Sequence, residues 1–328
     1  MIRFLKAGSV PWLLAHEVRL TWRAMDGKSG EKKDGLSGSK AVLILLVGVG
    51  AYLLPPRGQP WRWPDAVAPA RAAQEAPTPD GPCPGDADYP ARTEVVALPH
   101  DAGGYGGLQY ARTPLPPRTI ALTFDDGPDW RGDPRVFDIL EERCLTATFF
   151  HVGMWARMHP ELVREAIARG HGVASHSWSH PTQLRYWRAA NARHEVDRGF
   201  EALYAAAGGA ENVEPFFRFP GLNDSPALRG WLSEQGVTVI SAEGGTDDWR
   251  GLSSAAIVRR TVANMEASNG GVLILHQTRP AMVQALPGLL DELNRRGFRF
   301  VRISAGGRRA AYVNRVAQPA GEGTLATR

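Results

Sequence analysis

The chain has 328 residues, 43% of them hydrophobic and 22% charged, so it is long and apolar enough to build a sizeable core. Its formal net charge of +4 is spread along the sequence without a basic block interleaved with aromatic residues, which argues against a nucleic-acid-binding protein. An anionic wall polymer remains compatible with this charge.

The first strong signal is the apolar run at residues 41–54, which follows Lys32, Lys33 and Lys40. A basic flank before an apolar run predicts a membrane-targeting segment. The run is shorter than the roughly 20 residues of a full membrane span, as in a signal peptide. However, the nearest cleavage pattern, Ala66-Val67-Ala68, lies far beyond it. This favours a retained transmembrane anchor over a cleaved signal.

Residues 1–40 are expected to remain cytoplasmic, because basic residues flank membrane segments on that side. The true start of translation is either Met1 or Met25. The rest of the chain would then be anchored to the inner membrane and lie in the periplasm or outside the cell, or would be secreted after cleavage.

Residues 55–92 are rich in proline and alanine and predict a stiff linker. Residues 93–116 are expected to approach and pack on a folded domain at 117–305. The tail at 306–328 carries no motif and is expected to be disordered.

The segment 117–305 alternates apolar, β-branched runs with helix-like segments, which is typical of an α/β fold with a parallel sheet. One helix is expected at Glu161–Arg169, opened by Pro160 and closed by Gly170. We predict a distorted (β/α) barrel of about seven parallel strands. The predicted strands are Thr119–Phe124, Thr146–His151, Gly172–Ala174, Phe216–Phe219, Val237–Ser241, Val272–His276 and Phe298–Ile303.

Two adjacent carboxylates, Asp125 and Asp126, end the first of these strands just before Gly127-Pro128. Side chains of this kind either cap backbone groups of a turn or bind a cation, since an unpaired carboxylate is costly away from water.

His176 and His180 favour the second interpretation. Their spacing of four residues is expected to place both imidazoles on one face of a helical turn. Together with an aspartate they form a two-histidine, one-carboxylate set, which is typical of catalytic zinc or a similar divalent ion.

Five short motifs occur in order along the domain: Thr123–Pro128, His176–His180, Arg218–Gly221, Asp248–Trp249 and Leu273–His276. In these motifs the sequence resembles the polysaccharide deacetylase family, carbohydrate esterases of family 4 type with a NodB homology domain. The likeness covers approximately residues 117 to 305.

The resemblance implies a role for each matching residue. Asp125 would be the general base and His276 the general acid, while Asp126, His176 and His180 would hold a divalent metal, with zinc expected and cobalt or manganese compatible. Metal-activated water would then remove N-acetyl groups from an N-acetylglucosamine polymer, whether peptidoglycan, chitin-type oligosaccharide or exopolysaccharide.

Arg218 is expected to pair with Asp125 and keep it ionised and oriented, because a guanidinium is always charged. On the substrate side, Pro220 and Gly221 stand in the third motif, where relatives commonly have tyrosine in place of Gly221. The resemblance assigns the Gly221 N–H to the carbonyl oxygen of the substrate.

Ile274 and His276 share one face of a strand, so Ile274 and Trp249 are expected to wall a pocket for the acetyl methyl group. The resemblance also places an acid at position 245, where it would tune the catalytic histidine, yet this chain has Gly245. Glu243 or Asp247 is the expected substitute. Without one, the pKa of His276 should be low.

The resemblance further implies a disulfide between Cys83 and Cys144, which are the only cysteines of the chain, with free thiols as the alternative. Three other functions remain: an amidohydrolase for a small cyclic amide, an O-acetyl esterase for a xylan-like polymer, and an inactive carbohydrate-binding module. The complete set of motif residues argues against the inactive module.

Overall fold

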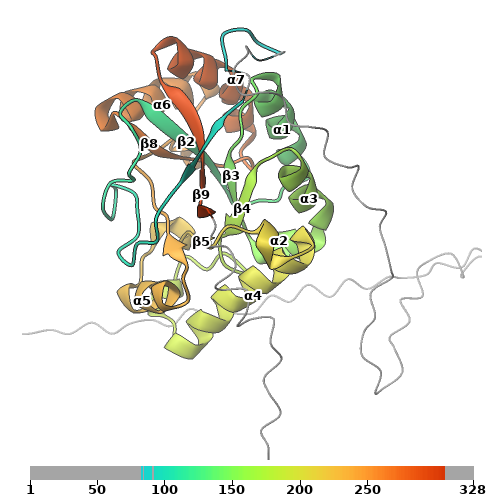
Figure 1. The fold of residues 1–328 in the computed structure, drawn as a ribbon, viewed down its shortest axis with the longest axis vertical. Helices are drawn as coiled ribbons and strands as arrows, with labels where there is room; N and C mark the ends of the chain where they lie inside the picture. Colours follow the sequence, from blue (N-terminus) through green and yellow to red (C-terminus); the bar gives the residue numbers. More distant parts are fainter. Residues whose placement is uncertain (1–82, 84, 91, 307–328) are drawn as a thin grey trace, which may run out of the picture. The chain divides into compact units, whose positions relative to one another are not determined.

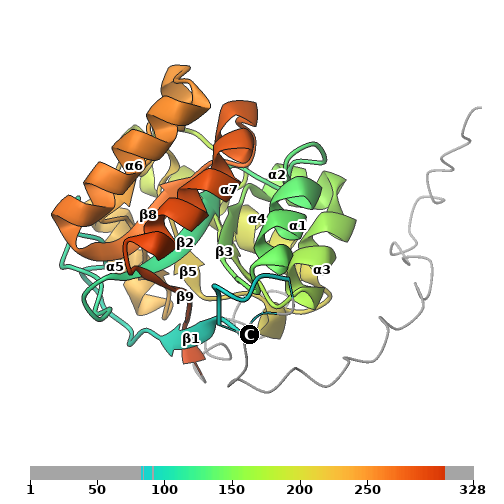
Figure 2. The same ribbon diagram turned by 90° about the horizontal axis from the view of Figure 1, so that it is seen from above.

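The computed structural model describes residue 83, residues 85–90 and residues 92–306. Within these residues, nine strands form one sheet, and every strand pairing is parallel. The sheet is curled, and helices α1, α3, α6 and α7 lie outside it (Figures 1 and 2).

The elements follow one another as alternating strands and helices. The strands are β1 Glu94–Ala97, β2 Thr119–Asp125, β3 Thr148–His151, β4 Gly172–Ser175, β5 Phe216–Phe217, β6 Thr238–Val239, β7 Gly244–Gly245, β8 Gly270–Leu275 and β9 Arg299–Ser304. The α-helices are α1 Asp133–Glu142, α2 Gly153–Met158, α3 Pro160–Ala168, α4 Ala189–Ala207, α5 Pro226–Glu234, α6 Ser254–Ser268 and α7 Pro280–Arg295. The short 3₁₀ helices are η1 Leu184–Tyr186, η2 Ala210–Asn212, η3 Pro220–Leu222 and η4 Asp248–Arg250.

The strand order confirms the predicted α/β class and its barrel-like parallel sheet. Strands β6, β5, β4, β3, β2, β8 and β7 are neighbours in that order, while β9 pairs with the first half of β2 and with β1. All seven predicted strands are present, and the predicted helix at Glu161–Arg169 is α3. Strands β1 and β7 were not predicted.

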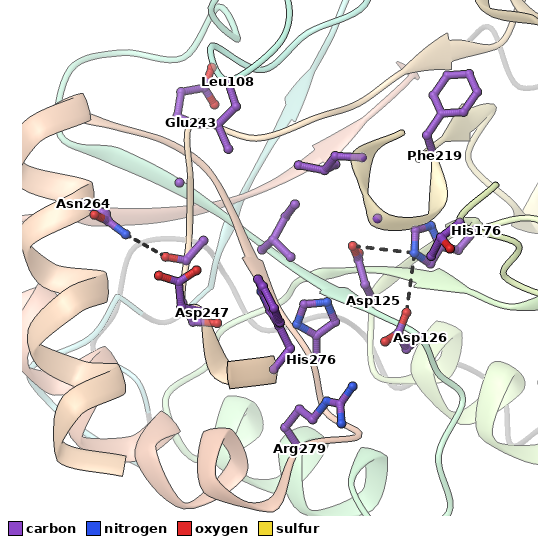
Figure 3. Close-up of a pocket in the computed structure, with 18 of the residues that line it drawn as sticks. Leu108, Asp125, Asp126, His176, Phe219, Glu243, Asp247, Asn264, His276 and Arg279 are labelled. Carbon is purple, nitrogen blue, oxygen red and sulfur yellow. Dashed lines mark hydrogen bonds and ion pairs between the residues drawn. The ribbon is translucent and has the colours of Figure 1, made fainter. Parts of the chain in front are cut away.

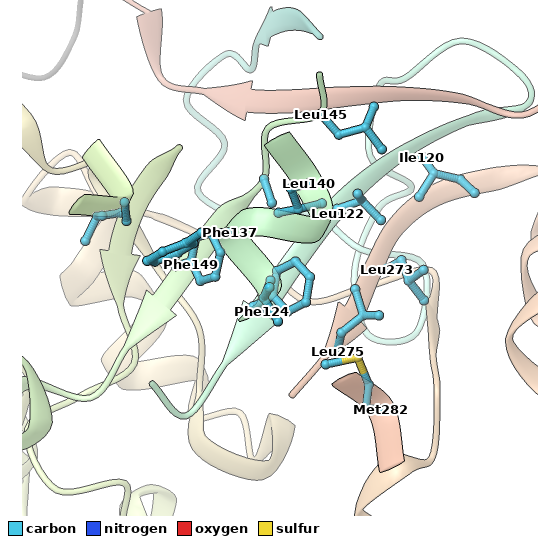
Figure 4. Close-up of a cluster of buried hydrophobic side chains, with 14 of the residues drawn as sticks. Ile120, Leu122, Phe124, Phe137, Leu140, Leu145, Phe149, Leu273, Leu275 and Met282 are labelled. Atoms are coloured by element: carbon cyan, nitrogen blue, oxygen red, sulfur yellow. The ribbon is translucent and has the colours of Figure 1, made fainter. Parts of the chain in front are cut away.

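Apolar side chains fill two layers, one on each face of the curled sheet. The outer layer packs β2, β3 and β8 against α1 and α7 (Figure 4). It contains Phe124, Phe149 and Leu273, whereas the inner layer contains Phe150 and Ile274. This alternation follows from the two-residue period of strands, and it decides which side chains point into the barrel.

Strand β9 crosses the amino-terminal end of the barrel. Thr148, the first residue of β3, donates from Oγ1 to the Ile303 carbonyl at 3.3 Å. Glu214, just before β5, accepts from Ala305 N at 2.9 Å and pairs with Arg302 at 3.1 Å. These contacts close the end of the barrel opposite the carboxyl ends of the strands.

The segment before β2 contacts the barrel at several points. Tyr105 makes bridges to Ala111 and Ile240. The buried Glu243 carboxylate accepts hydrogen bonds from Gly107 N at 3.0 Å and Thr113 N at 2.7 Å, so it fixes this segment against β7.

Packing begins earlier than the expected end of the linker at residue 92. Cys83 and Cys144 form the implied disulfide, and Tyr89 is 2% exposed within the outer core. Tyr89 also donates to Asp291 of α7 at 3.1 Å. The proline-rich and alanine-rich composition predicted a linker here, but Tyr89 is buried in the core and Cys83 is covalently bound to the domain.

The predicted segments 1–40 and 41–54, most of the linker and the tail from residue 307 lie outside the described residues. Within the part of the chain that is described, no helix combines the length and the apolar character needed to cross a bilayer.

Candidate active site

A cavity of about 920 Å³ lies at the carboxyl ends of the strands, where ligands bind in barrels of this kind. Asp125, Asp126, His176, His180 and His276 all line it. Figure 3 shows Asp125, Asp126 and His176 gathered together, with His276 beside them. The fold therefore brings together residues that are far apart in the sequence.

Asp125 is paired with Arg218, as predicted. The Nη1 atom of Arg218 lies 2.6 Å from Asp125 Oδ1, and the guanidinium is fully buried. Its other donors reach Thr123 Oγ1 at 2.8 Å and the carbonyls of Ile240 and Ser241 at 3.1 and 2.9 Å. Because every nitrogen has a partner, Arg218 holds one oxygen of Asp125 rigidly and leaves the other toward the cavity.

Asp126, His176 and His180 form a cluster that could hold a metal ion, with one ligand atom from each residue all within 4.8 Å of one another. Asp126 Oδ1 lies 3.1 Å from His180 Nε2 and 3.5 Å from His176 Nε2. Apart from these imidazoles, no described group donates a hydrogen bond to Oδ1, which is buried.

The donor set fits a divalent cation. The Nδ1 atom of His176 lies 2.8 Å from the Arg218 carbonyl, which can only accept, so Nδ1 carries the proton. In the neutral imidazole, Nε2 then presents its lone pair to the carboxylate oxygen, an arrangement that a cation between them would satisfy. Where no cation lies between these groups, burial raises the pKa of Asp126, but protonated imidazoles of His176 and His180 donate to its carboxylate and hold that pKa well below its usual range. With a cation or with protonated histidines, the carboxylate is charged.

The expected helical turn between the two histidines is wrong. Residues 176–180 form a loop in which Ser177 and His180 have positive φ angles of 69° and 58°. The carboxylate of Glu195 on α4 holds the loop by accepting from Ser179 N at 2.5 Å and from Ser179 Oγ at 2.9 Å. Left-handed backbone conformations, rather than helical periodicity, turn His180 back toward His176.

His276 is oriented by Asp248, and not by either of the acids expected to replace the one absent at Gly245. Its Nδ1 lies 2.7 Å from Asp248 Oδ1, and its backbone N donates to Oδ2 at 2.9 Å. Glu243 is instead bonded to the segment before β2, and Asp247 pairs with Arg260 at 2.6 Å. His276 therefore has a carboxylate partner, although position 245 carries no acid.

A low pKa of His276 was expected only without a substitute acid, and Asp248 is such a substitute. Burial lowers the pKa, but the hydrogen bond and charge of Asp248, together with the charges of Asp125 and Asp126, outweigh burial and raise it above its ordinary value. The imidazole thus holds a proton to higher pH than a free histidine. Because Nδ1 faces Asp248, Nε2 is the remaining atom for proton exchange.

The predicted substrate residues divide into two groups. Gly221, Trp249 and Ile274 line the cavity, whereas Pro220 is buried and is not among the lining residues. Gly221 has a φ of 60°, in the left-handed region that favours glycine.

Several lining residues were missed, including Leu108, Asn264 and Arg279. Leu108 belongs to the segment before β2, and Asn264 lies on an exposed face of α6, so neither stands near a motif. Asp248 belongs to the fourth motif, but its contact with His276 was not predicted. Its position directly before Trp249, in the loop after β7, is the sequence signal that indicates this role.

The fold and site define an α/β barrel protein in which a two-histidine, one-carboxylate cluster that could hold a metal lies beside a buried carboxylate and a carboxylate-bound histidine. The family model of polysaccharide deacetylases matches residues 112–240. A peptidoglycan-N-acetylglucosamine deacetylase of Bacillus cereus is 31% identical over 198 residues, covering 57% of this chain and 87% of that protein. The chain belongs to the polysaccharide deacetylase family.

Two further relatives agree with this assignment. A chitooligosaccharide deacetylase of Sinorhizobium fredii is 30% identical over 195 residues, covering 55% of this chain and 87% of that protein. The structure of Bdellovibrio bacteriovorus peptidoglycan deacetylase Bd3279 matches with a TM-score of 0.61 at 26% identity, over 70% of this chain and 64% of the other.

Some relatives extend well beyond the matched region. The chain spans 66% of a second Bacillus cereus peptidoglycan-N-acetylglucosamine deacetylase and 38% of PgdA of Listeria monocytogenes.

Proposed function

We propose that the protein removes N-acetyl groups from a polysaccharide containing N-acetylglucosamine. The observation that carries this proposal is the meeting of a metal cluster, a buried carboxylate and a carboxylate-bound histidine around one cavity. Amide hydrolysis needs an activated water, stabilisation of a developing oxyanion and a proton for the leaving amine.

Each requirement has a candidate residue. Asp125, held by Arg218, accepts a proton from the attacking water, and His276 gives its Nε2 proton to the leaving nitrogen. The Gly221 N–H donates to the carbonyl oxygen as it gains charge. A divalent ion held by Asp126, His176 and His180 would lower the pKa of a bound water to about 7 and polarise the acetyl carbonyl.

We assign zinc as the resident ion, because two imidazoles and one carboxylate with open positions suit catalytic zinc. Cobalt and manganese are compatible with the same donors. The purified chain should contain about one divalent ion, which chelation should remove together with activity. Full activity and normal metal content in His176→Ala would contradict the ligand assignment.

The decisive experiment measures acetate release from a panel of acetylated polymers. The panel holds peptidoglycan, chitooligosaccharide and an N-acetylated exopolysaccharide, with O-acetylated xylan as an alternative source of acetate. A small cyclic amide releases no acetate on hydrolysis, so its ring opening is followed separately by chromatography. We expect acetate release from the N-acetylglucosamine polymers. Hydrolysis of only the xylan or only the cyclic amide would contradict the proposal and would favour an O-acetyl esterase or a small-amide amidohydrolase, respectively.

We also propose that the catalytic domain acts outside the cytoplasm, anchored to the inner membrane through residues 41–54. The Cys83–Cys144 disulfide supports this location, because such bonds persist mainly in oxidising compartments. Cell fractionation and protease access to intact spheroplasts test it. Recovery of the full-length chain in the cytosol with both thiols reduced would contradict it and favour the small-amide substrate.

A further inference from the structure

The cavity extends well beyond the residues that act on an acetyl group. Its volume of about 920 Å³ is near the upper end of the 300–1,000 Å³ that is usual for ligand sites. From the metal cluster it continues to the face of α6 at Asn264 and to Leu108 (Figure 3). Ile274 and both residues of β7 also line it. We call the part beyond Ile274, lined by Leu108, Gly244, Gly245, Asn264 and Ala267, the distal arm.

The register of β7 determines which glycine faces the distal arm. Gly244 pairs with Leu273 of the outer core, and Gly245 pairs with Ile274 of the inner layer. A Cβ atom at Gly244 would lie 2.4 Å from the terminal methyl of Met265, so that side faces α6. A Cβ at Gly245 would meet nothing within 4 Å, which places it on the open side that Ile274 shares.

Most of the hydrogen-bonding capacity around the distal arm is used within the protein. The Asn264 amide donates to the Gly245 carbonyl at 2.9 Å, and Asp247 pairs with Arg250 and Arg260. The two Glu243 carboxylate oxygens accept from Thr113 N at 2.7 Å and Val272 N at 2.6 Å. What the arm offers a ligand is therefore mainly the apolar surface of Leu108, Ala267, Ile274 and the glycine strand.

An apolar arm that continues directly from the reacting centre fits an aliphatic chain. A sugar ring presents several hydroxyl groups, whereas among the groups named above it is chiefly the Asn264 amide that keeps hydrogen-bonding capacity, through Oδ1 and its second N–H. An acyl chain needs only apolar surface and space, and it enters the cavity attached to the carbonyl carbon that reacts.

We propose, on the basis of the deacetylase function proposed above, that the site also hydrolyses N-acyl groups longer than acetyl, such as N-propionyl and N-butyryl. Water adds to the acyl carbon and the carbon–nitrogen bond breaks. The acyl group leaves as its carboxylate, and the nitrogen takes a proton and leaves as the amine on the sugar. Gly245 is the residue that sets acyl length, because its missing side chain keeps the distal arm open behind Ile274.

The test uses chitooligosaccharides carrying N-acetyl, N-propionyl or N-butyryl groups, incubated with the full-length, zinc-loaded protein. A pocket closed behind the acetyl methyl should lose roughly 10-fold or more in kcat/KM for each added methylene. For such a closed pocket, the two extra methylenes of N-butyryl would lower kcat/KM by roughly 100-fold. In the wild type we expect kcat/KM for the N-butyryl substrate to be within about 10-fold of that for the N-acetyl substrate.

Gly245→Val should fill the arm, since a β-branched residue suits a strand and its φ is not positive here. The N-butyryl to N-acetyl ratio of kcat/KM should then fall by about 30-fold or more, within the range for rejecting a methylene. Gly230→Val on α5, where a Cβ also meets nothing within 4 Å, is the matched control and should leave the ratio unchanged. If Gly245→Val melts early, Gly245→Ala should give a smaller fall in the same direction.

The outcomes separate the two proposals. No release of any carboxylate by the wild type would overturn the deacetylase function, and this inference with it. Release of acetate but not butyrate would overturn this inference alone. Butyrate release with an unchanged ratio in both Gly245 variants would remove Gly245 as the length-setting residue.

Discussion

Asp125 and Asp126 are adjacent in the chain, yet their carboxylates have different partners. Asp125 is bound by a buried guanidinium, while Asp126 has a positive φ of 74° and turns toward two imidazoles. A non-glycine residue in this conformation is strained, and such strain concentrates at functional sites. The backbone of one residue thus separates a candidate base from a candidate ligand.

The first prediction follows from this separation. Asp125→Asn removes the proton acceptor but keeps the side-chain shape and the three ligands, so kcat should fall on the order of 10² to 10⁴-fold. Bound zinc, measured by elemental analysis, should stay near one ion per chain. Loss of the metal in this variant would make Asp125 a ligand and would exchange the two roles.

The second prediction concerns the pH dependence set by Asp248. A general acid must be protonated, so the raised pKa of His276 places the alkaline limb of the kcat/KM profile at higher pH than a free histidine would. Asp248→Asn removes the charge that raises this pKa, and the limb should move to lower pH. The loss of kcat/KM should grow with pH and approach 10² to 10⁴-fold.

The control for this variant is Asp247→Asn. Asp247 is bound to Arg250 and Arg260 rather than to His276, so the limb should not move. A shift in Asp247→Asn combined with an unmoved limb in Asp248→Asn would show that the orientation of the His276 side chain in solution differs from the one described.

At the scale of elements, the histidine loop depends on the helix beneath it. A Cβ at Gly199 of α4 would lie 2.7 Å from the carbonyl carbon of Ser177 and 3.0 Å from Trp178 N. Contacts that short require the backbone to move. Gly199 therefore lets α4 approach the segment between His176 and His180 closely enough for Glu195 to hold it.

The third prediction is that Gly199→Ala weakens metal binding although alanine favours a helix by about 0.5–1 kcal/mol. Displacing the loop should cost about 10–100-fold in zinc affinity, as losses of supporting contacts around metal ligands do. Titration against a competing chelator measures it. Gly230→Ala, where the added methyl meets nothing, should be slightly stabilised with unchanged zinc affinity; equal affinities in both variants would contradict the proposed support.

Particular elements show how far the sequence could predict this architecture. Strand β2 is predictable because its apolar run ends in two acids, and α3 because Pro160 and Gly170 mark its ends. Strand β7 consists of two glycines and has no side-chain pattern to detect. The partner of His276 depends on how the loop after β7 folds, and the loop at His180 depends on contacts with α4, so neither could follow from local spacing.

At the scale of the whole described domain, one end of the barrel carries the cavity and the other carries contacts that close the fold. The carboxyl ends of the strands gather the cavity residues, while β9, Cys83 and residues 85–90 cover surfaces away from them. Cys144 follows α1 and precedes β3, so the disulfide joins the chain at the amino-terminal end of the barrel. Loss of the disulfide is therefore expected to lower the stability of the domain and to leave its catalytic activity nearly unchanged.

The fourth prediction tests that separation with Cys83→Ser/Cys144→Ser. The cysteines are 61 residues apart, and in the chain-entropy model closing such a loop contributes about 4 kcal/mol. For a domain of this size the melting temperature should fall by about 8–16 °C, at 2–4 °C per kcal/mol. Reductant should lower the melting temperature of the wild type by a similar amount and leave that of the variant unchanged.

Activity supplies the discriminating measurement for this variant. Well below both melting temperatures, kcat/KM for acetate release should stay within about twofold of the wild type, because neither cysteine lines the cavity and changes away from a site are usually small. A large loss of activity with zinc still bound would mean that the disulfide positions the carboxyl ends of β2 and β3 through α1. The strands could not then be treated as a rigid frame for the site.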